Sequence, residues 1–251
     1  KERINLNTAN RITGIIENSK KQLFASSEIG TLYRFDQKTN KFLPDTNNFH
    51  SIKKMVIDND DNFWLAGIYG LNYYNTTTGK IKHFEYYREK NVKFPISEVN
   101  TVFLEGDTIW IGTVQGRIYY ILRKTLEVHL LKYNFDNTYY IFDIYKGKDG
   151  LLYIGTTNAL FIYDKKKESC ISYMYEKDNP TGLSAAGITK IFEDKQGNFW
   201  VGTSQGGINL ALTGKKFHNY NTFSKQVKLD FNNINCVFED RKGNIWLGSY
   251  D

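Results

Sequence analysis

An aspartate-rich segment, Asp58 to Asn62, is the stretch whose residue types most directly suggest chemistry. Its carboxylate and amide oxygens stand at alternating positions, as the oxygen ligands of calcium-binding loops do. The segment lacks the glycine at the bend and the distal bidentate glutamate that such loops use. Because the same turn recurs along the chain without these acids, the sequence favours a plain hairpin, and we expect no metal site and no cofactor.

The four histidines do not form a catalytic pattern. His83, His129 and His218 fall in the last strand-like segment of their repeats, and His50 lies in a connecting segment. Catalysis needs acids, bases or nucleophiles that converge on one point. The chain also has no glycine-rich phosphate loop, no G-x-S-x-G elbow and no H-E-x-x-H pair. We therefore expect a chain with no catalytic residues, and a glycan-active enzyme is the less favoured alternative.

Composition points to a β protein. The chain has 251 residues, of which 41% are hydrophobic and 16% aromatic, and an aromatic excess favours strands. No run of about 18 apolar residues is present, so no membrane contact is expected. The net charge of +6 comes with scattered lysines, which favours a solvated surface over nucleic-acid binding. Cys170 and Cys236 each lie in an apolar run and are expected to be buried free thiols.

A repeat of 40 to 47 residues organises the whole chain. Each copy has an anchor, an aromatic residue followed by an aliphatic and a small residue. The anchors are Phe24, Trp64, Trp110, Tyr153, Trp200 and Trp246. A fixed period of this length indicates stacked units or a propeller.

The fifth copy shows the local pattern best. "GITKIFED", "NFWVGT", "GINLAL" and "KKFHNY" have the length and residue types of four short strands, separated by tight turns. Asp194 is expected to cap the first turn through its side chain, and Gly197 to supply a positive φ. Successive side chains of a strand alternate between faces. Trp200 should therefore point to one face of the sheet, and Phe199 and Val201 to the other.

A sheet that is apolar on both faces must be covered on both sides, and no helical periodicity is present to cover it. The sequence therefore predicts an all-β fold, a β-propeller of four-stranded antiparallel blades with five complete units and a partial sixth. The expected blades are 12–50, 52–90, 98–134, 139–176 and 187–220, with a partial blade at 233–251. We expect one propeller region over 1–251, part of a larger propeller of about seven blades. Replacing Trp200 with Ala is expected to cost about 3 to 5 kcal/mol.

The segments Ile188 to Thr203 and Ile234 to Ser249 carry the pattern I-x-x-I/V-F-E-D-x-x-G-N-x-W-[LVI]-G-[TS]. This pattern resembles the two-component regulator propeller repeat, which is typical of periplasmic sensor regions of hybrid histidine kinases, especially in Bacteroidetes. The resemblance is strongest in the last two copies and weakest where Phe24 and Tyr153 replace the anchor Trp. It implies a periplasmic sensor that binds a glycan fragment and signals to a kinase elsewhere in the protein, often as a homodimer or against a neighbouring propeller.

The turns between second and third strands, with the loops between blades, are where a sensor of this kind is expected to contact its ligand. The turn-like segments at these points predict ligand-binding residues Tyr69, Tyr87, Arg88, Gln115, Asn158, Gln205 and Tyr250. Tyrosine rings suit stacking on sugars, and the +6 charge favours an acidic glycan by steering. The alternative is a structural or dimerising propeller without its own ligand. The Asp-turn-Trp arrangement also resembles the Asp box of sialidases, but the arginines show no blade-wise pattern.

Overall fold

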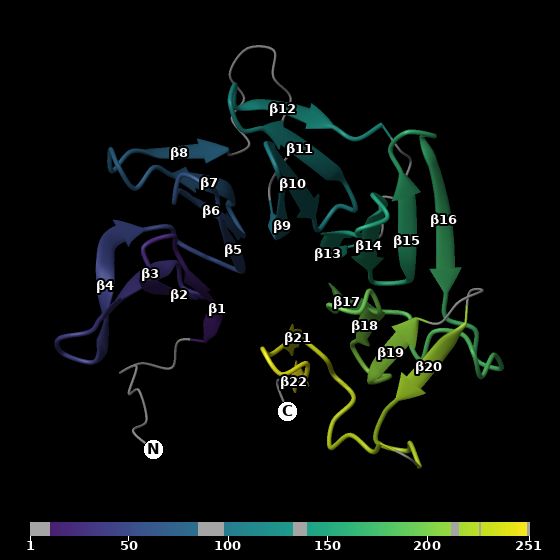
Figure 1. Ribbon diagram of the computed structural model, residues 1–251. Helices are drawn as coiled ribbons and strands as arrows, with labels where there is room; N and C mark the ends of the chain where they lie inside the picture. The colour runs from purple at the N-terminus through teal and green to yellow at the C-terminus, as the bar shows by residue number, and fades with distance from the viewer. Residues whose placement is uncertain (1–10, 85–97, 133–139, 212–215, 226, 250–251) are drawn as a thin grey trace. The chain divides into compact units, whose positions relative to one another are not determined.

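The structure is a computed structural model that describes residues 11–84, 98–132, 140–211, 216–225 and 227–249. All regular elements in these residues are β-strands (Figure 1). No helix in this part of the chain is long and apolar enough to cross a membrane. The chain divides into two compact units, Lys1–Val114 with Tyr119–His129, and Gln115–Ile118 with Leu130–Asp251.

Three antiparallel sheets of four strands each make up most of the first unit. The first sheet is β1 (Ile12–Glu17), β2 (Leu23–Ser27), β3 (Thr31–Asp36) and β4 (Lys41–Asn48). The second is β5 (Lys54–Ile57), β6 (Phe63–Gly67), β7 (Gly70–Tyr74) and β8 (Ile81–Phe84). The third is β9 (Val99–Glu105), β10 (Thr108–Thr113), β11 (Ile118–Leu122) and β12 (Glu127–Leu130).

The second unit repeats the same plan. One sheet is β13 (Ile141–Lys146), β14 (Leu152–Thr156), β15 (Ala159–Asp164) and β16 (Ser169–Met174). The next is β17 (Ile188–Glu193), β18 (Phe199–Thr203), β19 (Ile208–Ala211) and β20 (Phe217–Tyr220). A two-stranded sheet follows, β21 (Cys236–Glu239) and β22 (Ile245–Gly248).

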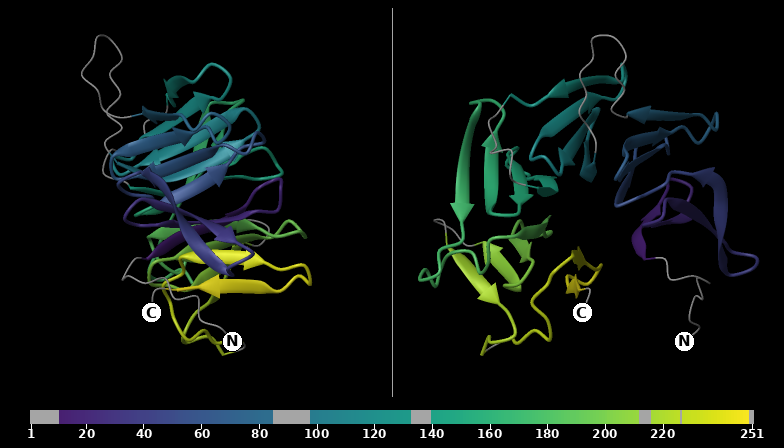
Figure 2. Two further views of the ribbon diagram at one scale, coloured as in Figure 1. Left: turned by 90° about the vertical axis from the view of Figure 1, so that its left-hand side faces the viewer. Right: turned by 180° about the vertical axis from the view of Figure 1, so that it is seen from behind.

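Within every four-stranded sheet the strands lie in chain order, so each strand pairs with the next through a hairpin. Inside each unit consecutive sheets pack face to face, with the first strands in contact: β1 on β5 and β5 on β9, then β13 on β17 and β17 on β21. Figure 2 shows these sheets from two further sides. Five four-stranded antiparallel blades and a two-stranded sheet are the β-propeller plan that the repeat predicts.

The alternation of side chains in the fifth blade is confirmed. Phe199 and Val201 pack with Tyr153 on the side of the preceding sheet, whereas Trp200 packs with Ile234 and Val237 of the following one. Each blade therefore presents one apolar face to each neighbour, which is why the repeat needs an aromatic anchor flanked by aliphatic residues.

The burial of the anchor residues in the last two copies of the repeat differs from expectation. Trp64 and Trp110 are fully buried and Tyr153 is 9% exposed, but Trp200 is half-buried and Trp246 is 60% exposed. The reason is that Trp64 and Trp200 are each covered by the following sheet of the same unit, and no described sheet of the second unit follows β22.

The two cysteines are a second correction. Both thiols are free, as expected, but Cys236 is exposed and Cys170 is half-buried. Cys236 lies on the same outer face of β21 as Phe238, which is 59% exposed. Cys170 lies in β16, the outermost strand of its sheet. An apolar run shows that a residue is in a strand, but not whether another sheet covers that side.

Candidate functional site

The turn between the first and second strand is organised by an aspartate in the second, fourth and fifth blades and in the two-stranded sheet. In the first blade Asn18 accepts the backbone N–H groups of this turn, and in the third Glu105 accepts the indole of Trp110. In the fifth blade one oxygen of the Asp194 carboxylate accepts the backbone N–H of Asn198 at 2.8 Å. The other accepts the Nε1–H of Trp200 at 2.9 Å. Gly197 has a φ of 87°, a left-handed conformation that favours glycine. The capping role expected of Asp194 is confirmed, and the same carboxylate also holds the anchor ring.

Other copies keep the link between the turn and the anchor. Trp64 donates to Asp58 at 3.2 Å and Trp246 to Asp240 at 3.0 Å. In the fourth blade the Tyr153 hydroxyl takes the place of the indole and donates to Asp149 at 2.7 Å. Burial, followed by this hydrogen bond, raises the pKa of Tyr153 well above its usual range. The hydroxyl is therefore protonated at any physiological pH.

The glutamate before the capping aspartate has a different role, which sequence reasoning missed. Glu193 accepts the backbone N–H of Lys148, in the turn of the preceding blade, at 3.0 Å. Glu239 accepts that of Lys195 at 2.9 Å. The ammonium group of Lys148 also donates to the backbone carbonyl of Asp194, and that of Lys195 to the backbone carbonyl of Asp240. The two residues of the repeated Glu-Asp pair therefore have different roles. The aspartate accepts hydrogen bonds within its own turn, and the glutamate accepts one from the turn of the preceding blade.

A loss of stability in acid is expected from these turns. Burial raises the pKa of Asp194, but hydrogen bonds from Trp200 and Asn198 outweigh it and hold the pKa below its usual value. Side-chain hydrogen bonds from Asn244 and Trp246 hold the pKa of Asp240 far below its usual range. Depressed carboxyl pKa values add stability that is complete above the unfolded-state value near ~4 and is lost as the pH falls through the folded-state value.

Urea unfolding between pH 6 and pH 2.5 measures this effect. The free energy of unfolding should be nearly constant at the upper end of this range and should fall below about pH 4. In Asp194→Asn the fall should be shallower, because one titrating group has been removed. An unchanged slope in this variant would contradict the assignment.

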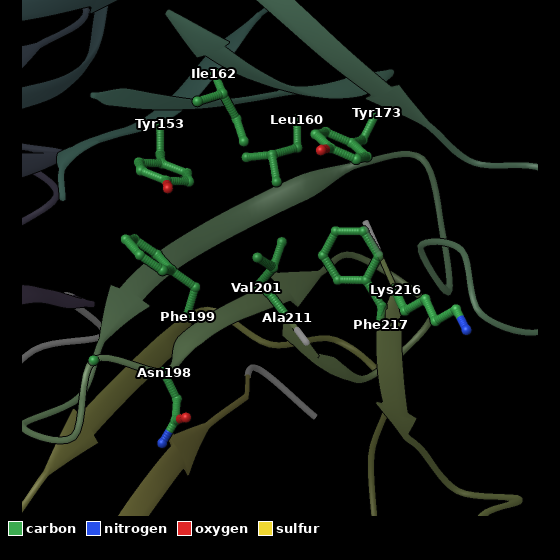
Figure 3. Close-up of a pocket in the computed structure, with 11 residues that line it drawn as sticks. Tyr153, Leu160, Ile162, Tyr173, Asn198, Phe199, Val201, Ala211, Lys216 and Phe217 are labelled. Atoms are coloured by element: carbon green, nitrogen blue, oxygen red, sulfur yellow. The ribbon is translucent and has the colours of Figure 1, made fainter. Parts of the chain in front are cut away.

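Two cavities lie at the turn end of the sheets, each between consecutive blades of one unit. The second-unit slot, of about 600 Å³, separates the sheet β13–β16 from the sheet β17–β20 (Figure 3). Tyr153, Leu160, Ile162 and Tyr173 form one wall. Phe199, Val201, Ala211 and Phe217 form the facing wall, with Asn198 and Lys216 at the margins (Figure 3).

The first-unit slot, of about 360 Å³, lies between the sheets β1–β4 and β5–β8. Three aromatic residues line it, Phe24, Phe63 and Tyr74. The other lining residues are polar: Asn18, Lys20, Gln22, Arg34, Asp45, Asp61, Thr76 and Thr77. The ring of Phe63 stacks near-parallel on that of Tyr74, with centroids 6.4 Å apart. The ring of Phe24 meets that of Phe63 edge-on, with centroids 4.9 Å apart. The slot therefore has an aromatic wall and a polar margin.

Both slots lie against an anchor that is not tryptophan. Phe24 lines the first slot and Tyr153 the second, whereas the fully buried indole of Trp64 packs among the side chains of the following sheet. A single six-membered ring fills less volume than an indole, and close-packed interiors leave a void where a smaller group stands. The sequence shows that two copies of the repeat lack the anchor tryptophan. Whether a cavity forms beside the smaller ring depends on the residues of the opposite wall.

The described residues among those predicted for ligand contact lie elsewhere, at the opposite ends of the strands. Tyr69, in the β6–β7 turn, is 59% exposed, and its ring meets that of His50 edge-on at 5.9 Å. Gln115, Asn158 and Gln205 occupy the equivalent turns between the second and third strands of the third, fourth and fifth sheets. None of these four residues lines either slot. Tyr87, Arg88 and Tyr250 lie outside the described residues.

The histidines are placed as expected in the fourth strands, His83 in β8, His129 in β12 and His218 in β20. The described residues contain no group of three or more histidine, cysteine, aspartate or glutamate side chains arranged to hold a metal ion. The carboxylate of Asp58 accepts backbone N–H groups of Asp60 and Asn62 at 3.0 Å. The Asp58 to Asn62 segment is thus a hairpin turn closed by its own hydrogen bonds.

Comparisons with known proteins fit this architecture. The sequence profile of the family described as two component regulator propeller matches residues 182–205 and 228–251. The fold is similar to the extracellular domain of a protein described as a one-component system from B. thetaiotaomicron, with a TM-score of 0.73, 16% identity, and coverage of 99% of this chain and 38% of that one. No curated protein matches the sequence.

Two further solved structures share the fold. The extracellular domain of a hybrid two-component system from B. thetaiotaomicron has a TM-score of 0.70 and 16% identity over 97% of this chain and 39% of that one. PorZ, a surface component of the type-IX secretion system of Porphyromonas gingivalis, has a TM-score of 0.68 and 14% identity over 96% and 37%. The chain thus spans less than two fifths of the length of these proteins. It has the fold of a β-propeller, and its residues 182–205 and 228–251 are similar to the two component regulator propeller family.

Proposed function

We propose that this chain is the ligand-sensing part of a periplasmic sensor of the hybrid two-component type, and that it binds a glycan-derived oligosaccharide. In this proposal the chain is not catalytic and passes the signal to a kinase in the same protein. The two matched repeats and the likeness in fold to the extracellular domain of a hybrid system support the class of protein. A neighbouring propeller or a second protomer is the proposed protein partner.

The observation that carries the glycan part is the composition of the first-unit slot. Sugars offer apolar C–H faces and many hydroxyl groups, so their sites combine aromatic walls with several fixed polar side chains. This slot has Phe24 and Tyr74 on its wall and eight polar residues around them. Its volume of about 360 Å³ suits one sugar unit of a longer chain.

The charges in the slot favour an acidic sugar. Its two carboxylates are already engaged: Asp61 accepts the backbone N–H and the hydroxyl of Ser19 at 2.9 and 2.6 Å. Asp45 accepts the backbone N–H and side-chain amide of Asn47 at 2.9 and 2.8 Å. Arg34 and Lys20, in contrast, form no salt bridge with any described side chain. A uronate or sulfate group would supply the missing partner, and the guanidinium can grip it with two hydrogen bonds.

Calorimetry on the whole chain tests the proposal, with uronic-acid or sulfated oligosaccharides compared with neutral ones at low and physiological salt. We expect acidic sugars to bind about tenfold more tightly, with the difference shrinking as salt rises. Arg34→Gln should remove this preference and leave neutral sugars unaffected. Lys38→Gln, which removes an equal charge outside the slot, should keep it. Equal or absent binding of acidic and neutral sugars would refute acidic-glycan sensing.

The second-to-third-strand turns and the loops between blades remain a rival location for the same function. Substituting Tyr69, Tyr87 and Arg88 together tests this location, because Tyr69, the described residue of the three, does not line the slot. If that triple variant loses sugar binding while Arg34→Gln keeps it, the sensor function stands and the site moves to these turns and loops.

A further inference from the structure

The second-unit slot has a chemistry of its own. Its facing walls are formed by aliphatic and aromatic side chains, as Figure 3 shows for Leu160, Ile162 and Val201. At one end the rings of Tyr153 and Phe199 stack with centroids 4.2 Å apart. At the other end Tyr173 and Phe217 meet edge-on at 5.8 Å. An apolar slot of about 600 Å³ is within the size range of small-molecule sites.

Most polar groups near this slot already have partners. The Tyr153 hydroxyl donates to Asp149 at 2.7 Å. The side-chain amide of Asn198 donates to Asp194 at 2.9 Å, and in Figure 3 it turns away from the facing wall. These groups build their own turns and are not available to a guest molecule.

Lys216 is the exception. It lies beside Phe217 at the margin of the slot (Figure 3), and its ammonium group forms no salt bridge with any described residue. The Tyr173 hydroxyl, on the facing wall at the same end, is a second potential donor. The slot therefore combines an apolar lining with one positive charge at its margin and the Tyr173 hydroxyl on one wall.

This pattern excludes a sugar as the preferred guest. A saccharide between these walls would bury hydroxyl groups with no partner, at a cost of about 1 to 3 kcal/mol for each such group. A molecule with a flat apolar body and a single anionic group would instead bury its body between the walls. Its charge would stay at the margin beside Lys216, in partial contact with water.

We propose that the second-unit slot binds a small apolar carboxylate, of the aromatic-acid class, with its carboxylate at Lys216 and its ring against the half-buried side chains of Ile162 and Ala211. The site is separate from the first-unit slot and does not depend on the glycan proposal.

Calorimetry with 2-naphthoate and its neutral analogue 2-naphthalenemethanol tests this site on the whole chain. We expect saturable binding of both, with the carboxylate about tenfold tighter, as for a charge-assisted contact. Lys216→Gln should reduce 2-naphthoate to the affinity of the alcohol, and Lys216→Arg should restore most of the difference. Lys228→Gln removes the same charge outside the slot and should behave as the unaltered chain.

A slot-filling variant locates the binding. Ala211→Phe places a ring between the walls and should weaken both probes by tenfold or more, with thermal melting confirming that the variant is folded. If neither probe binds the unaltered chain, or both bind equally well to Lys216→Gln and to the unaltered chain, the site is not as proposed. Unchanged binding to folded Ala211→Phe would likewise overturn the proposal.

Discussion

Replacing Trp64 with Ala is expected to lower the free energy of unfolding by about 3 to 5 kcal/mol. The ring is completely buried, packs among Val99, Val102 and Ile109 of the following blade, and donates to the Asp58 carboxylate at 3.2 Å. The variant therefore loses apolar contacts, leaves a cavity and removes one donor from a buried carboxylate. Urea unfolding followed by far-ultraviolet circular dichroism measures the loss without relying on tryptophan fluorescence.

The same substitution at other anchors provides matched controls. Trp200 is half-buried, so Trp200→Ala should cost about 1 to 3 kcal/mol, less than its sequence pattern suggests. Trp246 is 60% exposed, and Trp246→Ala should cost least of the three. An equal loss at all three positions would show that the anchors contribute through their hydrogen bonds to aspartate and not through packing.

Replacing Asp58 with Ala is expected to destabilise the chain by about 2 to 4 kcal/mol, because buried donors left without a partner each carry a large penalty. Asp58 is 4% exposed. Its carboxylate accepts the backbone N–H groups of Asp60 and Asn62, each at 3.0 Å, as well as the Trp64 indole. Asn62 and Trp64 are themselves buried, so solvent cannot readily replace the carboxylate at these two donors.

Asp240→Ala is the matched control, since it removes the corresponding contacts to Lys242, Asn244 and Trp246 from an exposed turn. There water can replace the carboxylate, and the loss should be clearly smaller. Urea unfolding of both variants at pH 7 makes the comparison. A smaller effect at Asp58 than at Asp240 would contradict the account of the turn as a buried hydrogen-bonded centre.

The sequence predicted the blade plan because its information is local. A hairpin turn needs particular residues, such as Asp194 to accept backbone N–H groups and Gly197 to adopt a positive φ. A strand with both faces covered needs apolar residues on both, as Phe199, Trp200 and Val201 provide. These requirements repeat with the period of the fold, so four strands per blade, the partial sixth blade and the facing of the anchor ring were all predicted correctly.

Burial was less predictable, because it depends on a different segment of the chain from the one that contains the residue. Trp64 and Trp246 follow the same local pattern, yet one is fully buried and the other mostly exposed. Cys236 lies in an apolar run and is exposed. In each case the deciding factor is whether a following sheet covers that face.

The candidate sites depended still more on tertiary structure. The amino-acid pattern alone shows that Phe24 and Tyr153 replace the anchor tryptophan, and hence where a blade interface contains a smaller ring. The residues that stand opposite follow from the folded arrangement: Tyr74 with Arg34 and engaged carboxylates at one slot, and Val201 with Phe217 and Lys216 at the other. A cavity is the volume that two facing surfaces fail to fill, and those surfaces come from segments distant in the chain, so no local pattern specifies it.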